Sequence, residues 1–382
     1  MRVLVSSTGG HGHFNPLLPF INASLQRGDE VLVIVPPVLR ETVEKHGYSF
    51  RISEGPPEQD SARIWQEFPT LPPEQASVLM NREWFGRICT AATLSTCERA
   101  FAEWKPDLIL REPCEYASAI VAERFNVPHA QIAISLSTVE ASVLPLVAPV
   151  LEPYGDHMAD RLFAAPYITR FPVSIDPSPF PSTMRFRDEE AVERKPLPGW
   201  WSTIQRPLIY LTFGSVSGAL QGGGDIITAA LEAVSSLDAN VLVTTGRQIE
   251  RSHFGRLPKN VHIEEWIPQQ EVLPHASVVV CHGGSGTTLG ALSAGVPLVM
   301  VPMFADQPYN ARLIEAAGAG LMIASSTGSA DERMTLDQGD IERLRQAITR
   351  VLVEVEFQHA AKRIAIEIAD MAGPSEILER FS

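Results

Sequence analysis

A short apolar run that ends at a glycine-rich turn constrains this chain more than any other feature. Residues 276–281 are mostly apolar, and the segment H-G-G-S-G-T at residues 282–287 follows directly, ahead of a stretch with helical spacing. This order predicts a buried strand that turns into a helix. Such a turn collects backbone N–H groups and the positive end of a helix dipole, which favours a bound anion. A tight glycine turn without a ligand is the alternative.

The bulk composition limits the class of protein. A chain of 382 residues favours two domains, and 45% hydrophobic with 20% charged residues is typical of a globular enzyme. The net charge of −14 argues against nucleic acid or an anionic membrane as the main partner. Four scattered cysteines without a C-x-x-C pair, and no apolar run of membrane-spanning length, predict a cytoplasmic protein with reduced thiols. We expect a monomer or a homodimer.

Apolar runs alternate with helical patterns along most of the chain. Runs without polar alternation are typical of parallel strands covered on both faces, so a parallel α/β sheet is predicted. For the first helix we expect Asn15 as the N-cap, Pro16 at the first helical position and Gly28 as the stop. Strands are predicted at residues 2–6, 30–35, 107–110, 129–134, 208–213, 241–244, 261–264, 277–281 and 297–301, and further helices at 117–125, 226–234 and 308–317.

A proline-rich stretch interrupts this alternation at residues 176–206. Its proline density favours an extended connection. We therefore predict two Rossmann-like halves, residues 1–195 and 207–356, joined by a linker at 196–206 and followed by a C-terminal segment at 357–382. Ligands of such sheets bind at the carboxyl ends of the strands, so we expect the site in a cleft between the halves.

The turn after the first strand reads S-S-T-G-G-H-G-H-F-N-P over residues 6–16. Gly10 and Gly12 approach the dinucleotide fingerprint, but Asn15 stands where the third glycine belongs, which argues against NAD. No third ligand with zinc-site spacing accompanies His11 and His13, so no metal is expected. A histidine at this strand end is either structural or suited to act as a general base.

Three segments of the second half place polar groups at strand ends. Gly214 and Ser215 close L-T-F-G-S, either as an ordinary loop or beside the His282 turn. Trp266 begins W-I-P-Q, where the following proline keeps the backbone extended and the indole is either core or free to stack on a flat base. Asp306 and Gln307 precede a helix, where they cap it or bind sugar hydroxyls.

Together these segments resemble the donor-binding box of the nucleotide-sugar glycosyltransferases of natural-product biosynthesis. The likeness rests on W-I-P-Q, H-G-G-S-G-T-T-L and G-V-P-L-V-M-V-P-M-F-A-D-Q-P-Y-N-A, and is greatest to bacterial enzymes that glycosylate antibiotic and polyketide aglycones. The G-H-G-H-F-N-P start and the W-K-P-D-L-I-L stretch extend it along the chain. The resemblance implies the GT-B fold, with an N-terminal acceptor domain, a C-terminal donor domain and a final helix, from about Phe357, that returns to the first domain.

The resemblance also implies roles for single residues. His13 matches the family's general base, and Glu112 takes the place of the carboxylate, usually an Asp, that orients it. The implied reaction is an inverting, metal-independent transfer of a hexose that needs no cofactor beyond the nucleotide sugar itself. The nucleotide and its diphosphate are assigned to Gly214, Ser215, Trp266, Ile267, Gln269, His282, Gly284, Ser285, Gly286 and Thr287, and the sugar to Asp306 and Gln307.

Gly290 departs from the family's pattern. Many relatives carry a Glu at this position that binds both ribose hydroxyls. A glycine there tolerates a 2′-deoxyribose, so we expect a dTDP-sugar in preference to a UDP-sugar.

The acceptor is the least constrained part. Trp65, Met80, Trp84 and Phe85 are either core or the lining of an apolar aglycone pocket, with a hydroxyl or an aromatic carbon of a polyketide as the expected acceptor. Two other functions stay open: a nucleotide-sugar epimerase of the same fold, and a non-catalytic protein that binds a nucleotide sugar or a partner enzyme.

Overall fold

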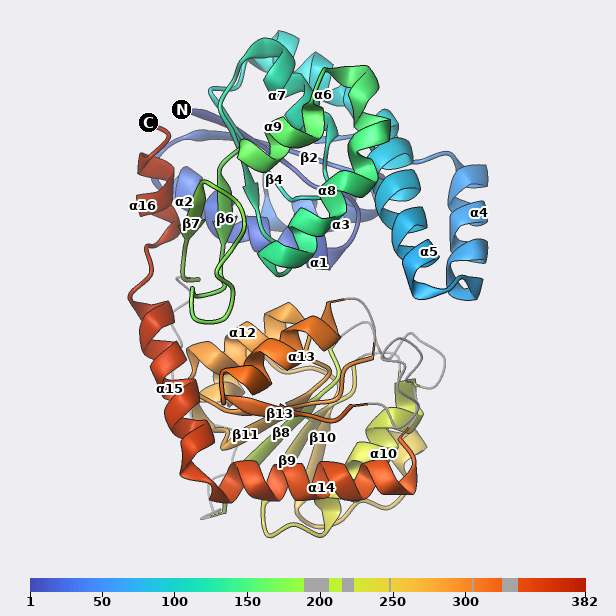
Figure 1. Cartoon of the computed structure of the whole chain (residues 1–382), viewed down its shortest axis with the longest axis vertical. Helices are drawn as coiled ribbons and strands as arrows, with labels where there is room; N and C mark the ends of the chain where they lie inside the picture. The colour runs from blue at the N-terminus through green and yellow to red at the C-terminus, as the bar shows by residue number, and fades with distance from the viewer. Residues whose placement is uncertain (189–205, 215–222, 247–248, 304–305, 325–335) are drawn as a thin grey trace. The chain divides into compact units, whose positions relative to one another are not determined.

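A computed structural model describes residues 1–188, 206–214, 223–246, 249–303, 306–324 and 336–382. The chain divides into two compact units (Figure 1). The predicted linker, apart from Arg206, and the predicted site residue Ser215 lie outside the described residues. The first unit comprises Met1–Phe171, Asp176–Glu189 and Met371–Ser382, and the second comprises Pro172–Ile175 and Glu190–Asp370.

The first unit is built on a parallel sheet that has seven strands in the described residues, in the order β3-β2-β1-β4-β5-β6-β7. Its central strands are buried along their length because their side chains are apolar on both faces. The strands are β1 (Arg2–Ser6), β2 (Glu30–Val35), β3 (Phe50–Ile52), β4 (Leu108–Arg111), β5 (His129–Ile132), β6 (Tyr167–Thr169) and β7 (Thr183–Arg185).

Helices of the first unit lie around this sheet (Figure 1). The π-helix η4 (Leu79–Cys89) packs on α8 (Ser137–Leu151). Gly86 allows the two helices to come close, since a methyl group there would lie 2.9 Å from Cγ2 of Val150. The α-helices are α1 (His11–Phe14), α2 (Leu18–Gln26), α3 (Arg40–His46), α4 (Glu58–Glu67), α5 (Pro73–Val78), α6 (Thr90–Trp104), α7 (Ala117–Phe125), α8 (Ser137–Leu151), α9 (Met158–Ala164) and α16 (Pro374–Glu379).

The start of the first helix differs from the prediction. Asn15 is not an N-cap, because the helical turn already begins at His11, with Gly10 at the N-cap position and a hydrogen bond from Phe14 N to Gly10 O of 3.1 Å. Pro16 lacks an N–H group and lies in a short 3-10 turn, Asn15–Leu17, that joins α1 to α2. The glycine turn therefore places His13 on a short helix that follows β1.

The second unit repeats the architecture with a parallel sheet that has six strands in the part of the chain described, in the order β10-β9-β8-β11-β12-β13. Its strands are β8 (Leu208–Thr212), β9 (Asn240–Thr244), β10 (Val261–Glu264), β11 (Val278–Cys281), β12 (Leu298–Met300) and β13 (Gly320–Met322). Its helices are α10 (Gly223–Ser235), α11 (Gln269–Val272), α12 (Ser285–Ser293), α13 (Gln307–Ala316), α14 (Gln338–Val353) and α15 (Val355–Ala369).

The two C-terminal helices belong to different units. Helix α15 packs on α12 and α14 in the second unit, whereas α16 packs on α2 in the first. The backbone N–H of Arg187 donates to Ala372 O at 3.0 Å, beside the isolated bridge between Phe186 and Ala372. The segment that the sequence assigned from residue 357 onward thus changes units at Met371. None of the described helices is both long and apolar enough to cross a bilayer.

All strands predicted from apolar runs are present, with ends displaced by at most two residues. Strand β5 stops at Ile132 because the N–H groups of Ile134 and Ser135 donate to Glu140 Oε1, at 2.8 and 2.7 Å, instead of to a neighbouring strand. The strands β3, β6, β7 and β13, each three residues long, were not predicted.

Each sheet reverses its strand order at one pair of neighbouring strands. In the first unit β1 lies beside β4, with Ser6 opposite Arg111, and in the second β8 lies beside β11, with Thr212 opposite Cys281. Ligands of open parallel sheets bind at such switch points, where the outgoing turns diverge. Ligand-binding and catalytic side chains are therefore expected in the turns that follow these four strands.

Candidate active site

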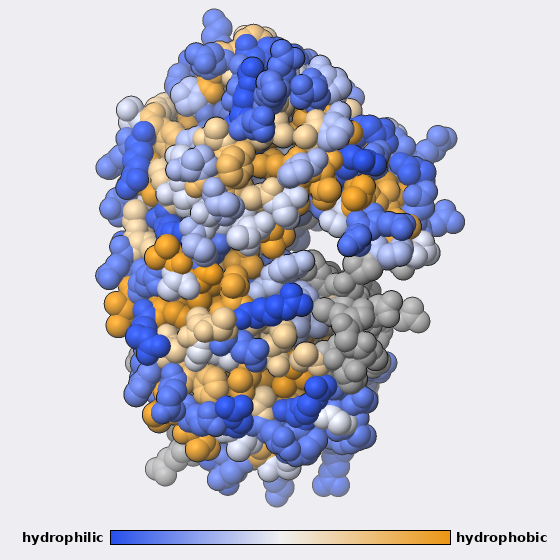
Figure 2. Space-filling model, viewed as in Figure 1, coloured by the Kyte–Doolittle hydropathy of each residue, from blue (hydrophilic) through white to orange (hydrophobic). Residues whose placement is uncertain are grey.

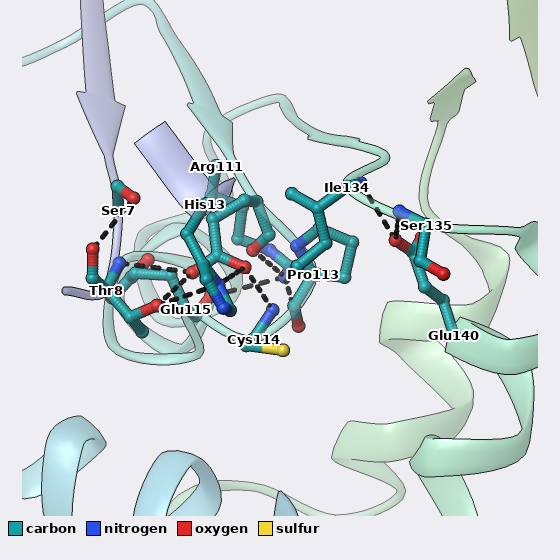
Figure 3. A network of polar contacts seen from close by, with 11 residues as sticks. Ser7, Thr8, His13, Arg111, Pro113, Cys114, Glu115, Ile134, Ser135 and Glu140 are labelled. Atoms are coloured by element: carbon teal, nitrogen blue, oxygen red, sulfur yellow. Dashed lines mark hydrogen bonds and ion pairs between the residues drawn. The ribbon is translucent and has the colours of Figure 1, made fainter. Parts of the chain in front are cut away.

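A histidine and a carboxylate meet at the switch point of the first unit (Figure 3). His13 lies on α1 after β1, and Glu112 directly follows β4. The Nδ1 atom of His13 is 3.2 Å from Oε2 of Glu112, with the Glu112 side chain fully buried and that of His13 22% exposed. Glu112 is one methylene longer than the aspartate that is usual at its position, and its carboxylate contacts the imidazole. His11 is exposed on the same short helix.

The Glu112 carboxylate accepts hydrogen bonds on both oxygens. Oε1 accepts from the Thr8 N–H at 3.1 Å and from the Thr8 hydroxyl at 2.6 Å, and Oε2 accepts from the Cys114 N–H at 2.7 Å as well as facing His13. Burial by itself raises the pKa of Glu112, but the charge and hydrogen bond of His13, with those of Thr8 and Cys114, hold that pKa below its usual range. Glu112 is thus an anion at neutral pH.

The pKa of His13 results from two opposing effects. Burial lowers the pKa, and the nearby charge and hydrogen bond of Glu112 raise it; the sum lies above the ordinary value of 6.5. Among the described residues, every hydrogen bond or ion pair of His13's side chain runs through Nδ1. A carboxylate at Nδ1 favours the tautomer whose other nitrogen, Nε2, carries the lone pair that can accept a proton.

Arg111 fixes the loop that carries Glu112. Its fully buried guanidinium donates to the backbone oxygens of Glu112 (3.1 Å), Pro113 (3.3 Å) and Glu115 (3.2 Å), and to the side-chain oxygen of Gln131 (3.3 Å). Burial lowers the pKa of Arg111, while neighbouring acidic groups raise it in part. Three carbonyls held by one cation make the loop rigid, so the Glu112 side chain starts from a fixed backbone.

His13, Glu112 and Cys114 also offer three metal-ligand atoms within 4.8 Å of one another. The chemistry of the set fits a metal poorly. Burial, and then the charge of Glu112, raise the pKa of the Cys114 thiol well above its usual value, whereas a metal needs the thiolate. The carboxylate oxygens are already engaged by hydrogen bonds from Thr8 and Cys114. The cluster is better suited to hold and move a proton.

The switch point of the second unit carries a helix start. Helix α12 begins at Ser285, after Gly284 at the N-cap position, which has extended geometry and no side-chain cap. The hydrogen bond from Thr288 N to Gly284 O (3.0 Å) closes the first turn, so the N–H groups of Ser285, Gly286 and Thr287 have no partner within the helix. Backbone donors and the positive end of the helix dipole thus coincide here.

The His282 imidazole is packed between glycines. A methyl group at Gly284 would collide with its Nε2, and one at Gly214 would lie 2.9 Å from its Cε1. Burial lowers the pKa of His282 to about 4, against a smaller raising effect of Asp306. His282 is therefore neutral at pH 7 and brings no positive charge to this turn, and it is hydrogen-bonded to the Thr212 backbone.

A buried amide joins this turn to the residues after β12. Asn310, 1% exposed, donates to Gly283 O at 2.9 Å, Ser285 Oγ at 3.1 Å and Asp306 Oδ2 at 3.1 Å. The Ser285 hydroxyl also donates to Asp306 Oδ2 at 2.7 Å. The predicted sugar ligand Asp306 is thereby tied to the predicted phosphate turn. Gln307 is buried, and its Oε1 accepts the Met303 N–H at 2.9 Å.

The segment after β10 combines an exposed ring with an anchored amide. Trp266 is 65% exposed, so it is not a core residue. Three residues later Gln269 begins α11 and donates from Nε2 to the Thr287 hydroxyl at 3.0 Å, which links this segment to the start of α12. Ile267, between them, is half-buried. All the donor residues predicted in the described part of the second unit therefore lie in turns after β8, β10, β11 and β12, or in the first turn of the helix that follows.

The aromatic residues expected at the acceptor pocket lie on α4 and η4 of the first unit. Trp65 is 53% exposed, and its ring centroid is 5.8 Å from that of Trp84. Met80 is half-buried beside this pair. The Phe85 ring is 5.2 Å from the His13 imidazole, centroid to centroid. Figure 2 shows hydrophobic residues among hydrophilic ones on the side of the first unit where α4 and α5 lie.

Comparisons with known proteins agree on one class of enzyme. Residues 228–382 match the family model described as Erythromycin biosynthesis protein CIII-like, C-terminal domain. The chain is 29% identical to the elloramycin glycosyltransferase of Streptomyces olivaceus, over 100% of this chain and 97% of that protein. It is 26% identical to the 10-deoxymethynolide desosaminyltransferase of Streptomyces venezuelae, with the same coverage. The matched family model and both relatives indicate a glycosyltransferase of natural-product biosynthesis.

A solved structure supports the fold of this glycosyltransferase. The glycosyltransferase SsfS6 of Streptomyces sp. SF2575, complexed with thymidine diphosphate, matches with a TM-score of 0.73 and 24% identity, over 100% of this chain and 99% of that chain. The predicted α/β class, with two parallel-sheet domains of the GT-B fold, is confirmed.

Four residues of the candidate site were not predicted: Thr8, Arg111, Cys114 and Asn310. Arg111 could have been found as a charged residue at the end of an apolar run, and Asn310 belongs to the donor-binding segment that carries the family resemblance. The Thr8 side chain acts on Glu112 across 104 positions of sequence, and Asn310 acts on Gly283 across 27. Contacts over such separations leave no local pattern in the sequence.

Proposed function

We propose that this glycosyltransferase moves a hexose or deoxyhexose from a dTDP-sugar to a hydroxyl group of a hydrophobic natural-product aglycone, with His13 as the general base. The observation that carries the proposal is the 3.2 Å contact between His13 Nδ1 and the buried Glu112 carboxylate. An oriented imidazole whose pKa lies above 6.5 suits removal of a hydroxyl proton near neutral pH.

The donor site in this proposal is the group of turns around α12. The N–H groups of Ser285, Gly286 and Thr287, with the neutral His282 side chain, hold the diphosphate and stabilise the charge that develops as it leaves. The exposed Trp266 ring stacks on the pyrimidine base. Asp306 binds sugar hydroxyls while its Oδ2 is held by Ser285 and Asn310.

The remaining predicted donor groups have narrower roles in this proposal. Gly214 and Gly284 make room for His282, and Gln307, the residue after Asp306, accepts the Met303 N–H. Gln269 holds Thr287 beside the diphosphate turn. Each of these side chains or glycines sets the position of a group that would touch the donor.

A thymidine nucleotide is the proposed donor type because of the surroundings of Gly290. A methyl group there would lie 3.2 Å from Leu273 Cδ1 and 3.6 Å from Gln269 Oε1, so a side chain long enough to bind both ribose hydroxyls does not fit without a shift. The thymidine diphosphate bound to the solved relative supports the same choice.

Direct attack of the acceptor on the anomeric carbon inverts the configuration of that carbon. The N–H donors of α12 serve in place of a metal ion.

The acceptor in this proposal binds against η4. Phe85 lies against the proposed base, and Trp84, the residue before it in η4, packs against Trp65. An aromatic polyketide presents flat apolar rings that stack on such side chains and a phenol whose proton His13 can take. Deprotonation of the phenol also activates an adjacent ring carbon, so a C-glycoside is a second product of the same geometry.

The test is a comparison of transfer and donor binding in the wild type and His13→Ala. Products from dTDP- and UDP-sugars with a panel of phenolic aglycones are identified by mass, and dTDP affinity is measured by calorimetry. We expect transfer from dTDP-sugars, and a loss of about 10²-fold or more in His13→Ala with unchanged dTDP affinity. Near-normal turnover of His13→Ala on a hydroxyl acceptor would contradict the assigned base, and a preference for UDP-sugars would contradict the donor type.

A further inference from the structure

A hydroxyl group lies against both members of the proposed catalytic pair. Thr8 Oγ1 donates to Glu112 Oε1 at 2.6 Å and is 3.1 Å from His13 Nδ1 (Figure 3). Thr8 is 7% exposed and belongs to the turn between β1 and α1, the turn that also carries His13. One side chain therefore connects the strand end, the carboxylate and the base.

The distribution of donors shows what this hydroxyl adds. The backbone N–H groups of Thr8 and Cys114 each bind one oxygen of the Glu112 carboxylate, at 3.1 and 2.7 Å. The Thr8 hydroxyl makes the shortest of the hydrogen bonds to Oε1, and it is the only one of these groups that also touches the imidazole. It thus fixes the rotation of the carboxylate so that Oε2 faces Nδ1.

A glutamate needs such a contact more than an aspartate does. The Glu112 side chain has one more rotatable bond than the aspartate usual at its position, so without a lateral contact its carboxylate has more orientations available. The Thr8 hydroxyl binds Oε1 of Glu112, and the other oxygen, Oε2, faces His13. Donation of its proton to Glu112 leaves its lone pairs toward Nδ1, where the imidazole N–H is shared between Glu112 and Thr8.

We propose that Thr8 is a positioning residue that holds the Glu112 carboxylate against His13 and so lets a glutamate perform the orienting task. This inference rests on the proposed function, because it treats His13 as the base. Thr8 does not take part in the chemistry; its hydroxyl sets the orientation of the carboxylate and hence the imidazole tautomer.

The experiment replaces Thr8 by valine, which keeps the shape and removes the hydroxyl, and by serine, which keeps the hydroxyl. We expect Thr8→Val to lower kcat about 10-fold, the effect of one hydrogen bond to a charged group, with the KM for the sugar nucleotide unchanged. Thr8→Ser should stay within about 3-fold of the wild type. NMR titration of the His13 ring should show a lower pKa in Thr8→Val and a restored one in Thr8→Ser, because Glu112 no longer faces Nδ1 when the hydroxyl is missing.

A double-mutant cycle separates positioning from a general structural role. In the Glu112→Gln background Thr8→Val should change kcat less than about 3-fold, since the orienting charge is already gone. An equal loss in both backgrounds, or an unchanged kcat and His13 pKa in Thr8→Val, overturns the proposal. Thr169→Val is the matched control: Thr169 is also buried, and its hydroxyl accepts the Phe171 N–H at 3.1 Å and makes no recorded contact with His13.

The NMR arm keeps this inference apart from the proposed function. If His13→Gln transfers sugar at the wild-type rate, the assigned base is wrong, yet the His13 pKa in Thr8→Val still decides whether Thr8 positions the carboxylate. A pKa that stays constant in all Thr8 variants refutes the positioning role whatever the activity. Thermal unfolding of each variant confirms that the comparison is made between folded proteins.

Discussion

A methyl group at Gly214 would lie 2.9 Å from Cε1 of His282, on a residue whose φ is +76°. The two residues follow β8 and β11, the neighbouring strands at the switch point of the second sheet. A residue without a side chain is thus needed both for the backbone conformation and for the space that the imidazole fills. The position of His282 depends on a residue 68 positions earlier in the chain.

Gly214→Ala should therefore weaken donor binding. The positive φ costs about 1–2 kcal/mol with any side chain, and the contact with His282 adds to it, so we expect dTDP affinity to fall at least about 10-fold. Calorimetric titration with dTDP measures the change. Gly28→Ala is the control, because Gly28 also has a positive φ, +81°, but open space around it. A control that loses as much dTDP affinity as Gly214→Ala would show that global strain, and not His282, is responsible.

Binding of a dTDP-sugar should not depend on the charge of His282. Burial lowers its pKa to about 4, so the imidazole is neutral throughout the range from about pH 6 to pH 8. We expect His282→Ala to weaken dTDP binding about 10-fold at pH 6 and by the same factor at pH 8, because the group that is lost is uncharged at both values. A factor that grows steeply toward pH 6 in calorimetry contradicts a neutral His282.

The rate of transfer should depend on pH through His13. A base acts when deprotonated, and its pKa in the folded protein lies above 6.5, so kcat/KM should fall as the pH drops through that raised value. In Glu112→Gln the raising charge is gone and burial alone lowers the pKa, so the acidic limb should move below pH 6.5 while the maximal rate falls about 10²-fold. A limb that does not move when Glu112 is replaced shows that another group controls it.

Asn310→Ala should lower both stability and donor affinity. The substitution removes a buried amide that donates to Gly283 O, Ser285 Oγ and Asp306 Oδ2, and leaves a buried carbonyl unpaired. We expect a loss of about 1–3 kcal/mol in the free energy of unfolding and a weaker donor complex. Asn81→Ala is the control, since the exposed Asn81 amide also donates to a backbone oxygen, at 2.9 Å, and should change stability by less than about 0.5 kcal/mol. Denaturant unfolding and dTDP titration of both variants check it.

The fold was accessible from the sequence because its strands are continuous apolar runs. β1 and β2 begin and end at the predicted residues, since a parallel strand covered on both faces leaves no polar alternation to obscure its ends. The edge strand β10, in which buried and half-buried residues alternate, was also predicted, whereas β7, with Thr183 and Arg185 at its ends, was not. The predicted start of the first helix was wrong because the helix begins at the glycine turn and not at Asn15.

From the residues alone, the sequence indicated a glycine turn at His282 and a histidine close behind the first strand, and the family resemblance then assigned His13 and Glu112. Residues at strand ends can be predicted to share a site because parallel strands bring their carboxyl ends to one edge, whatever lies between them. Only the tertiary structure decided how these groups are held. Thr8 bonds to Glu112, Asn310 joins Asp306 to the turn before α12, and Gly214 gives His282 its space, all through contacts between segments apart in sequence. Hydrogen-bond geometry and close packing depend on positions in space, and no local pattern of residues encodes them.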